Sequence, residues 1–164
     1  MASTIVTFEL GGREVEVMVR PMTTLQSVLR NQLGLTATKD GCRQGGCGSC
    51  TVLVDGQPMM SCLLPVEDVA GRRVTTLESI TPAEGLHPVQ RAFLDANALQ
   101  CGYCTPGMVM VSTALLDHQP APTDDDIRQA LTGNICRCTG YRPIVTAVHD
   151  AAAAMRANAG EQAR

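Results

Sequence analysis

Residues 41–50 read "GCRQGGCGSC" and place three cysteines and four glycines within ten positions. A stretch this rich in glycine favours a tight loop over a regular helix or strand. The segments "TVLVD" and "PMMSCLL" follow around Gly56 and predict a β-hairpin that carries a further cysteine. The stretch therefore predicts a cysteine-rich loop held at the base of a hairpin.

Four cysteines belong to this region and follow the spacing C-x4-C-x2-C with a later fourth member. They are Cys42, Cys47, Cys50 and Cys62. This is the plant-type ferredoxin pattern for a [2Fe–2S] cluster. Four thiolates around two irons and two sulfides leave negative charge, which backbone N–H groups can solvate. We expect the loop glycines to let the backbone curl closely around the sulfurs: Gly41, Gly45, Gly46 and Gly48.

Other uses of these four cysteines fit less well. A four-cysteine zinc site usually pairs two C-x2-C knuckles, whereas one interval here is four residues long. A thioredoxin-like role for Cys47 and Cys50 leaves Cys42 and Cys62 unexplained. Disulfides are rare in the reducing cytoplasm, which is where we expect this protein because its N-terminus lacks a secretory signal.

Composition narrows the function classes. The chain has 164 residues, a net charge of −3 and eight cysteines. Its N-terminus lacks the features of a secretory signal, so we expect a cytoplasmic protein in which cysteines serve metal or redox chemistry. With 2% aromatic residues and no basic stripe, a nucleic-acid partner is not expected. No apolar run approaches the length of a membrane span.

The N-terminal half predicts an α+β domain over residues 1–78. Alternation of apolar and polar residues indicates a hairpin of residues 4–10 and 13–19. Residues 23–33 have helical spacing, with Thr23 or Thr24 as N-cap. After the second hairpin, residues 72–80 predict a last short strand.

Residues 79–164 predict four helices and hence a small bundle. One begins at His87-Pro88, with Val89, Phe93 and Leu94 facing inward. The others are expected to begin at Thr105-Pro106, at Thr123 and at Pro143. Thr105 would be the N-cap of its helix, and the adjacent Met108 and Met110 are expected in the core rather than as soft metal ligands.

A second set of four cysteines lies in "QCGYCTPG" and "NICRCTGY". They are Cys101, Cys104, Cys136 and Cys138. Each pair precedes a predicted helix, so two helix N-termini could face one anionic centre. The spacing C-x2-C…C-x-C does not by itself decide between zinc and an iron–sulfur cluster.

Together, "GCRQGGCGSCTVLVDG", "QCGYCTPGMVM" and "GNICRCTGYRPI" closely resemble the small iron–sulfur subunit of the molybdenum hydroxylases, the xanthine oxidase family. The resemblance covers about residues 4–155 and leaves no cysteine over. It implies a ferredoxin-like β-grasp domain, residues 1–78, followed by an all-α four-helix bundle, residues 79–164. Each domain would hold one [2Fe–2S] cluster.

The resemblance also implies a role in a complex. In this family a large subunit carries a molybdopterin-type molybdenum cofactor, and electrons leave through the bundle cluster, then the ferredoxin-like cluster, to FAD on a medium subunit. The second cysteine set would lie nearest molybdenum, and Gln100 and Cys138 would contact the pterin of the neighbouring subunit. The chain would have no catalytic residue of its own and would join a heterotrimer or its dimer.

Two alternatives stay open at this point. One is a free-standing two-cluster ferredoxin, and the other is an interaction protein stapled by zinc. Among the remaining residues, Asp124, Asp125 and Asp126 are expected to cap a helix rather than bind a cation. Arg137, between two cysteines, could tune a redox potential, touch a partner, or be an ordinary surface residue.

Overall fold

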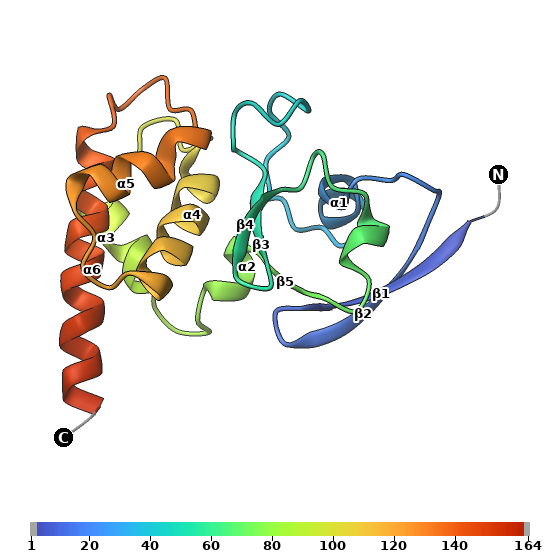
Figure 1. Ribbon diagram of the computed structural model, residues 1–164, viewed down its shortest axis with the longest axis horizontal. Coiled ribbons are helices and arrows are strands. Elements are labelled where there is room, and N and C mark those ends of the chain that lie inside the picture. The colour runs from blue at the N-terminus through green and yellow to red at the C-terminus, as the bar shows by residue number, and fades with distance from the viewer. Residues whose placement is uncertain (1–2, 163–164) are drawn as a thin grey trace.

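The computed structural model describes residues 3–162 and divides into a sheet region and a helical region that lie side by side (Figure 1). The sheet region occupies the first half of the chain, and the helices α3 to α6 occupy the second. Within residues 3–162, no helix is long and apolar enough to cross a membrane.

The sheet has five strands in the order β2-β1-β5-β3-β4. The first hairpin and the third and fourth strands are antiparallel pairs, while β5 runs parallel to β1 and antiparallel to β3. The strands are β1 (Thr4–Leu10), β2 (Arg13–Val19), β3 (Thr51–Val54), β4 (Gln57–Met60) and β5 (Arg73–Thr75). The mixed sheet with helices confirms the α+β class.

Two strand predictions are wrong at their ends. The segment expected to be a strand over residues 72–80 turns into a helix, α2 (Leu77–Ile80), because Thr76 and Ser79 form a capping box. The strand expected to run through "PMMSCLL" ends at Met60. There the Ser61 hydroxyl donates to the Cys50 carbonyl at 2.7 Å, which ties the ends of β3 and β4 together next to Cys62.

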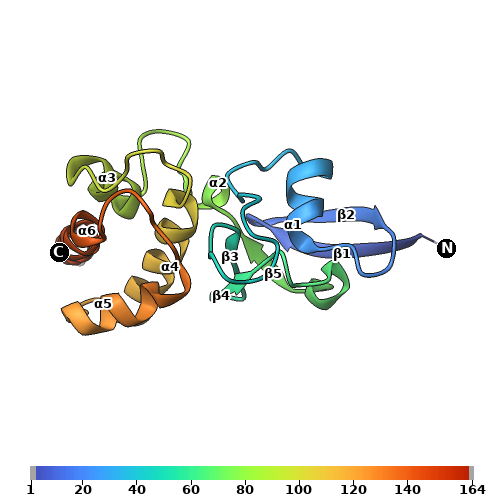
Figure 2. The same ribbon diagram turned by 90° about the horizontal axis from the view of Figure 1, so that it is seen from above.

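One short helix covers the sheet. The α1 helix (Leu25–Ser27) begins at the predicted N-cap Thr24 and continues as a π-helical turn, Val28–Gln32. Figure 2 shows α1 lying over β1 and β2. Its apolar residues complete a core with the inward residues of the strands, among them Phe8, Val17, Leu25, Leu29 and Val52. A 3-10 turn, Val66–Val69, closes the far side of this core.

Four helices form the second region. They are α3 (Pro88–Asp95), α4 (Thr105–His118), α5 (Asp124–Ala130) and α6 (Arg142–Gln162), with a 3-10 turn at Leu131–Gly133. They enclose one apolar core that includes Val89, Phe93, Met108, Ile127 and Ile144. The helix α5 lies across α6 rather than alongside it (Figures 1 and 2).

The expected helix starts and core residues hold with three exceptions. The helix α6 begins at Arg142, one residue before the expected Pro143. Cys104, not Thr105, is the N-cap of α4, and the buried Thr105 hydroxyl has no hydrogen-bond partner. Leu94 is 47% exposed rather than inward. Met108 and Met110 are fully buried, which confirms their assignment to packing.

The two regions meet where α4 lies next to β3 and β4. Leu53 of β3 contacts Met110 and Ala114 of α4, and Leu77 and Ile80 of α2 close the apolar cluster that they form. The regions are therefore joined by a small dry interface as well as by the connecting chain.

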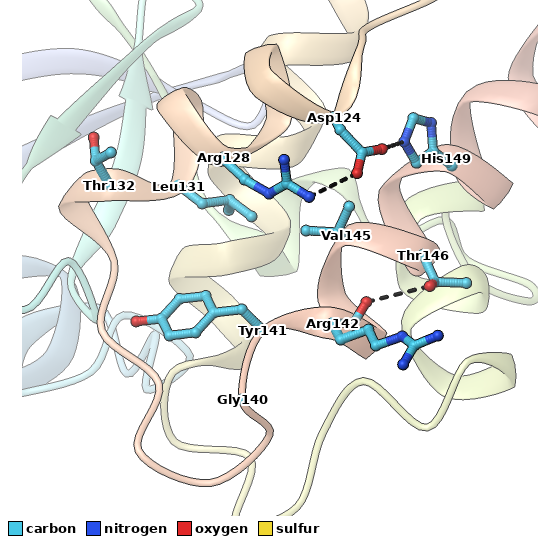
Figure 3. A pocket seen from close by; sticks show the side chains of 10 residues that line it. All are labelled: Asp124, Arg128, Leu131, Thr132, Gly140, Tyr141, Arg142, Val145, Thr146 and His149. Atoms are coloured by element: carbon cyan, nitrogen blue, oxygen red, sulfur yellow. Dashed lines mark hydrogen bonds and ion pairs between the residues drawn. The ribbon is translucent and has the colours of Figure 1, made fainter.

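The ion pair between α5 and α6 gives a pH-dependent prediction (Figure 3). The Asp124 carboxylate accepts from His149 Nε2 at 2.7 Å and from Arg128 at 2.8 Å. The His149 hydrogen bond, with the Arg128 charge, holds the pKa of Asp124 below its usual value. Because the folded-state pKa is depressed, this stabilisation is present above about pH 4 and is lost as pH falls through the lower folded value.

We therefore expect Asp124→Asn to lower the thermal midpoint at neutral pH and to match the wild type in strong acid. Asp125→Asn is the control, since its side chain is 95% exposed and we expect a smaller change. Thermal unfolding measured across pH tests this. A constant difference between Asp124→Asn and the wild type at every pH would contradict it.

Candidate metal-cluster sites

The loops that carry the cysteines lie along one side of the molecule, the top of Figure 1. All eight cysteines are free thiols. A cavity of about 350 Å³ is lined by two members of the first set and by the whole second set: Cys42, Cys47, Cys101, Cys104, Cys136 and Cys138. The fold thus brings half of the first quartet and all of the second to a common cavity.

The first quartet is divided into an outer and an inner pair. In the outer pair, the Gln44 and Gly46 backbone N–H groups donate to Cys42 Sγ at 3.4 Å. The pKa of Cys42 is lowered to about 6. The hydrogen bond from the Gln44 N–H group has the largest effect, and the neighbouring Cys47 thiol has the next largest. In the inner pair, burial raises the pKa of Cys50 to about 11, and the Cys62 thiol lies beside it.

The loop geometry explains part of the glycine pattern. A Cβ atom at Gly41 would lie 2.9 Å from Cys47 Sγ and 2.6 Å from Ser49 Oγ, so the backbone does wrap closely around a sulfur there. At Gly48 the expectation is wrong, because the close neighbours are Gly133 and Asn134 of the helical region. That glycine serves contact between the two regions.

The second quartet is also arranged as two pairs. Cys101 and Cys138 are exposed, and their sulfurs lie 3.6 Å apart. Cys104 lies deeper at the start of α4, where burial and then the adjacent Cys136 thiol raise the pKa of Cys104 to about 12. Each half of the quartet thus brings two thiols together from different loops.

Tyr141 holds the loop of the second quartet. Its hydroxyl accepts from the Cys136 backbone N–H at 2.9 Å and donates to the Asn134 carbonyl at 3.1 Å. The Thr139 backbone N–H group lies 3.4 Å from Cys136 Sγ and its hydroxyl 3.1 Å away. The sulfur is therefore presented by a network of short-range polar contacts.

The two-by-two arrangement matches the ligand pattern of a binuclear cluster. A [2Fe–2S] cluster takes two thiolates on each of two irons, whereas a structural zinc ion takes four ligands around one point. The residues present fit the binuclear cluster.

The other predicted site residues are exposed on the same side as the second quartet. Gln100 is exposed next to Cys101, and Arg137 lines the shared cavity. Tyr103, 47% exposed, donates from its hydroxyl to the Asp40 carbonyl at 2.6 Å. That bond links the second quartet's loop to the first quartet's loop.

Sequence reasoning missed the direct contact between the two quartets. The Ile135 backbone N–H donates to the Cys47 carbonyl at 3.0 Å, and the Asn134 side chain donates to the Gly48 carbonyl at 3.0 Å. A weak signal existed in the tyrosines, since both tyrosines of the chain stand beside a cysteine motif. Nothing in the spacing indicated which loop would meet which.

A larger cavity, about 660 Å³, lies between α5 and α6 (Figure 3). Its lining includes the Asp124, Arg128 and His149 network and no cysteine. Among the residues that line this cavity, Tyr141 is the one that is hydrogen-bonded to a cysteine of the second quartet. The predicted cysteine ligands therefore line the smaller cavity and not this one.

Comparison with known proteins agrees with this geometry. Residues 8–75 match the family described as "2Fe-2S iron-sulfur cluster binding domain", and residues 76–149 match "[2Fe-2S] binding domain". One nicotinate dehydrogenase chain from Pseudomonas putida is 46% identical over 93% of this chain and 98% of its own length. The nicotine 6-hydroxylase small subunit of Paenarthrobacter nicotinovorans is 46% identical over 87% of this chain and 86% of its own.

A solved structure shows the same fold. Quinoline 2-oxidoreductase from Pseudomonas putida 86 has a chain that superposes with a TM-score of 0.91 at 42% identity, covering 97% of this chain and 98% of that one. Both regions and their arrangement are therefore shared with that protein.

The Tyr141 network gives a prediction that is independent of any bound group. In Tyr141→Phe the Cys136 N–H loses its partner, which should cost about 1–3 kcal/mol of local stability. We expect faster amide hydrogen exchange in the peptide spanning residues 134–141. Tyr103→Phe is the control, because water can replace its exposed bond. Equal exchange in Tyr141→Phe and the wild type would contradict the proposed network.

Proposed function

This chain belongs to the small iron–sulfur subunits of the molybdenum hydroxylase family, and we propose that it carries electrons from a molybdenum–pterin site on a large partner subunit to FAD or another acceptor. It is an electron-transfer subunit of an oxidoreductase complex. The detailed proposal rests on one observation. Two quartets of thiols, each arranged as two pairs, lie on loops that are joined by the hydrogen bond from the Ile135 N–H to the Cys47 carbonyl.

Each quartet would hold one [2Fe–2S] cluster, which when bound supplies a reversible one-electron carrier. In the ferredoxin-like β-grasp domain, proposed as residues 1–78, the ligands would be Cys42, Cys47, Cys50 and Cys62. In the four-helix bundle domain, proposed as residues 79–164, they would be Cys101, Cys104, Cys136 and Cys138.

The exposure of the thiols supports a direction of transfer. Cys101 and Cys138 reach the surface beside Gln100, so this face is available to the pterin of a molybdenum-carrying subunit. In the sheet region, Cys62 lines a separate polar cavity of about 370 Å³ with Gln26 and Arg30. That side is where we place the medium subunit with FAD. The complex would be a heterotrimer or its dimer.

The protein's own groups have a defined task in this proposal. Backbone N–H groups at Gln44, Gly46 and Thr139 direct positive dipole ends at sulfur and so stabilise thiolate charge. The sheet and the helical core keep these donors fixed, so little reorganisation accompanies a change in charge. The chain contributes no group to the bond-making step.

The names of relatives that match along most of their length support a substrate class for the complex. Their names refer to nicotinate, nicotine and quinoline, which are all nitrogen-containing aromatic rings. We place the substrate of this complex in that class, with selectivity residing in the large subunit. Assays of the purified complex with quinoline, nicotinate and a simple aldehyde would separate this class from aldehyde oxidation.

Metal analysis tests the cofactor content. We expect about four irons and about four acid-labile sulfides per chain, since each cluster brings two of each. The reduced protein should show two distinguishable EPR signals and should purify with a molybdenum-containing subunit. Stoichiometric zinc without labile sulfide would refute the proposal and restore the zinc-stapled alternative. A stable two-cluster protein that binds no large subunit would favour a free-standing ferredoxin.

A matched pair of cysteine variants tests the order of transfer. Cys101→Ser should remove one EPR signal and block reduction of the remaining cluster by substrate in the complex. Cys42→Ser should remove the other signal and leave the remaining cluster reducible by substrate. The measurement is rapid-freeze EPR after substrate addition. Normal substrate reduction of the first-quartet cluster in Cys101→Ser would show that the order is wrong.

A further inference from the structure

We infer that Gly48 and Gly107 are positioning residues that set the distance between the two cysteine quartets. Neither glycine is placed against a thiol by its immediate neighbours, and both lie where the two regions touch backbone to backbone. The inference rests on the proposed function, because the spacing matters only if both quartets carry electrons.

The Gly48 carbonyl is fixed from both sides. It accepts from the Thr51 backbone N–H at 3.1 Å and from the Thr51 hydroxyl at 2.7 Å, both within the sheet region. It also accepts from Asn134 Nδ2 at 3.0 Å, across the boundary between the regions. Asn134 is itself buried. An oxygen held by three donors cannot move aside without losing hydrogen bonds.

Gly107 packs against that same oxygen. It is the third residue of α4, three positions after Cys104. A Cβ atom at Gly107 would lie 2.2 Å from the Gly48 carbonyl oxygen and 3.2 Å from the Gly48 carbonyl carbon. Contacts this short do not occur, so any side chain at this position must separate α4 from the first-quartet loop.

Gly48 makes the reciprocal approach. A Cβ atom there would lie 2.4 Å from the Gly133 carbonyl oxygen, and Gly48 also has φ of +68°. The two glycines therefore let residues 47–48 lie between the start of α4 and the segment 133–135. Because Cys47 and Cys104 are close neighbours of these glycines in the chain, moving the backbones apart would move the quartets apart.

Backbone conformation does not explain the glycine at 107. Gly107 lies in a regular helix and lacks the positive φ that other glycines of the chain adopt. Glycine inside a helix is less stable than alanine, because glycine loses more conformational freedom on folding. Helix stability would thus favour alanine, so it is the contact with Gly48 that requires glycine.

The spacing bears directly on electron transfer, since tunnelling weakens steeply with distance. The bond from Ile135 to the Cys47 carbonyl lies within the same contact. A side chain at position 107 would strain or break this bond while leaving the four thiols of each quartet in place relative to one another. The expected phenotype is therefore poor communication between two intact clusters.

The test is Gly107→Ala in the complete complex, with Gly133→Ala as matched control. The control lies at the same contact, but its Cβ atom would meet only the flexible Met60 Cε, at 3.3 Å. We expect Gly107→Ala to retain full iron and sulfide and both EPR signals. The magnetic dipolar interaction between the two reduced clusters should weaken, and transfer to the first-quartet cluster should slow several-fold. Gly133→Ala should keep the wild-type interaction and rate.

The outcomes separate the inference from the proposed function. A wild-type protein without two iron–sulfur signals would refute the proposed function itself. A fully loaded Gly107→Ala with unchanged dipolar interaction would overturn the spacing inference alone. If Gly107→Ala does not assemble, Asn134→Ala, which removes the clamp without adding bulk, must weaken the interaction. An unchanged interaction in Asn134→Ala would then overturn the inference.

Discussion

The contact of residues 47–48 with residues 133–135 fixes how the sheet region and the helical region sit against each other. Two consecutive carbonyls of the first-quartet loop accept hydrogen bonds from two consecutive residues of the second-quartet loop. Backbone groups this close exclude intervening side chains and fix the relative orientation of the loops. The sheet region holds residues 47–48 in place, and the helical region holds residues 133–135 in place.

In each region, the ends of strands or helices position the cysteines. The ends of β3 and β4 place Cys50 and Cys62 in the buried part of the sheet region, where Ser61 bonds the Cys50 carbonyl. On the other side, α4 begins at Cys104 and buries most of its length, including Met108 and Met110. A close-packed core resists small displacements. The precision of the contact is therefore set by the two cores, and Cys104 and Cys136 pack directly against the helical one.

Local features were predictable from sequence to the extent that they depend on local interactions. Strands β1 and β2 follow from strict alternation, and the N-caps Thr24 and Thr123 follow from side-chain chemistry. The errors lie where neighbours compete: Thr76 and Ser79 cap a helix inside an expected strand, and Cys104 replaces Thr105 as N-cap. The first three ligands of the first quartet could be predicted because their spacing is a local pattern, whereas the second quartet joins two distant motifs and was assigned from the family resemblance.

The contact between the quartets could not be predicted in this way, because it joins residues that are far apart in the chain. Spacing within "GCRQGGCGSC" gives the same glycine signal at Gly41 and Gly48. The structure assigns them different tasks, since Gly41 makes room for the Cys47 sulfur and Gly48 makes room for Gly133. The loop of residues 41–50 therefore surrounds a thiol and also forms part of the surface against which the helical region packs. A side chain at position 41 would collide with the Cys47 sulfur. A side chain at position 107 would contact no sulfur and would instead increase the distance between the two quartets.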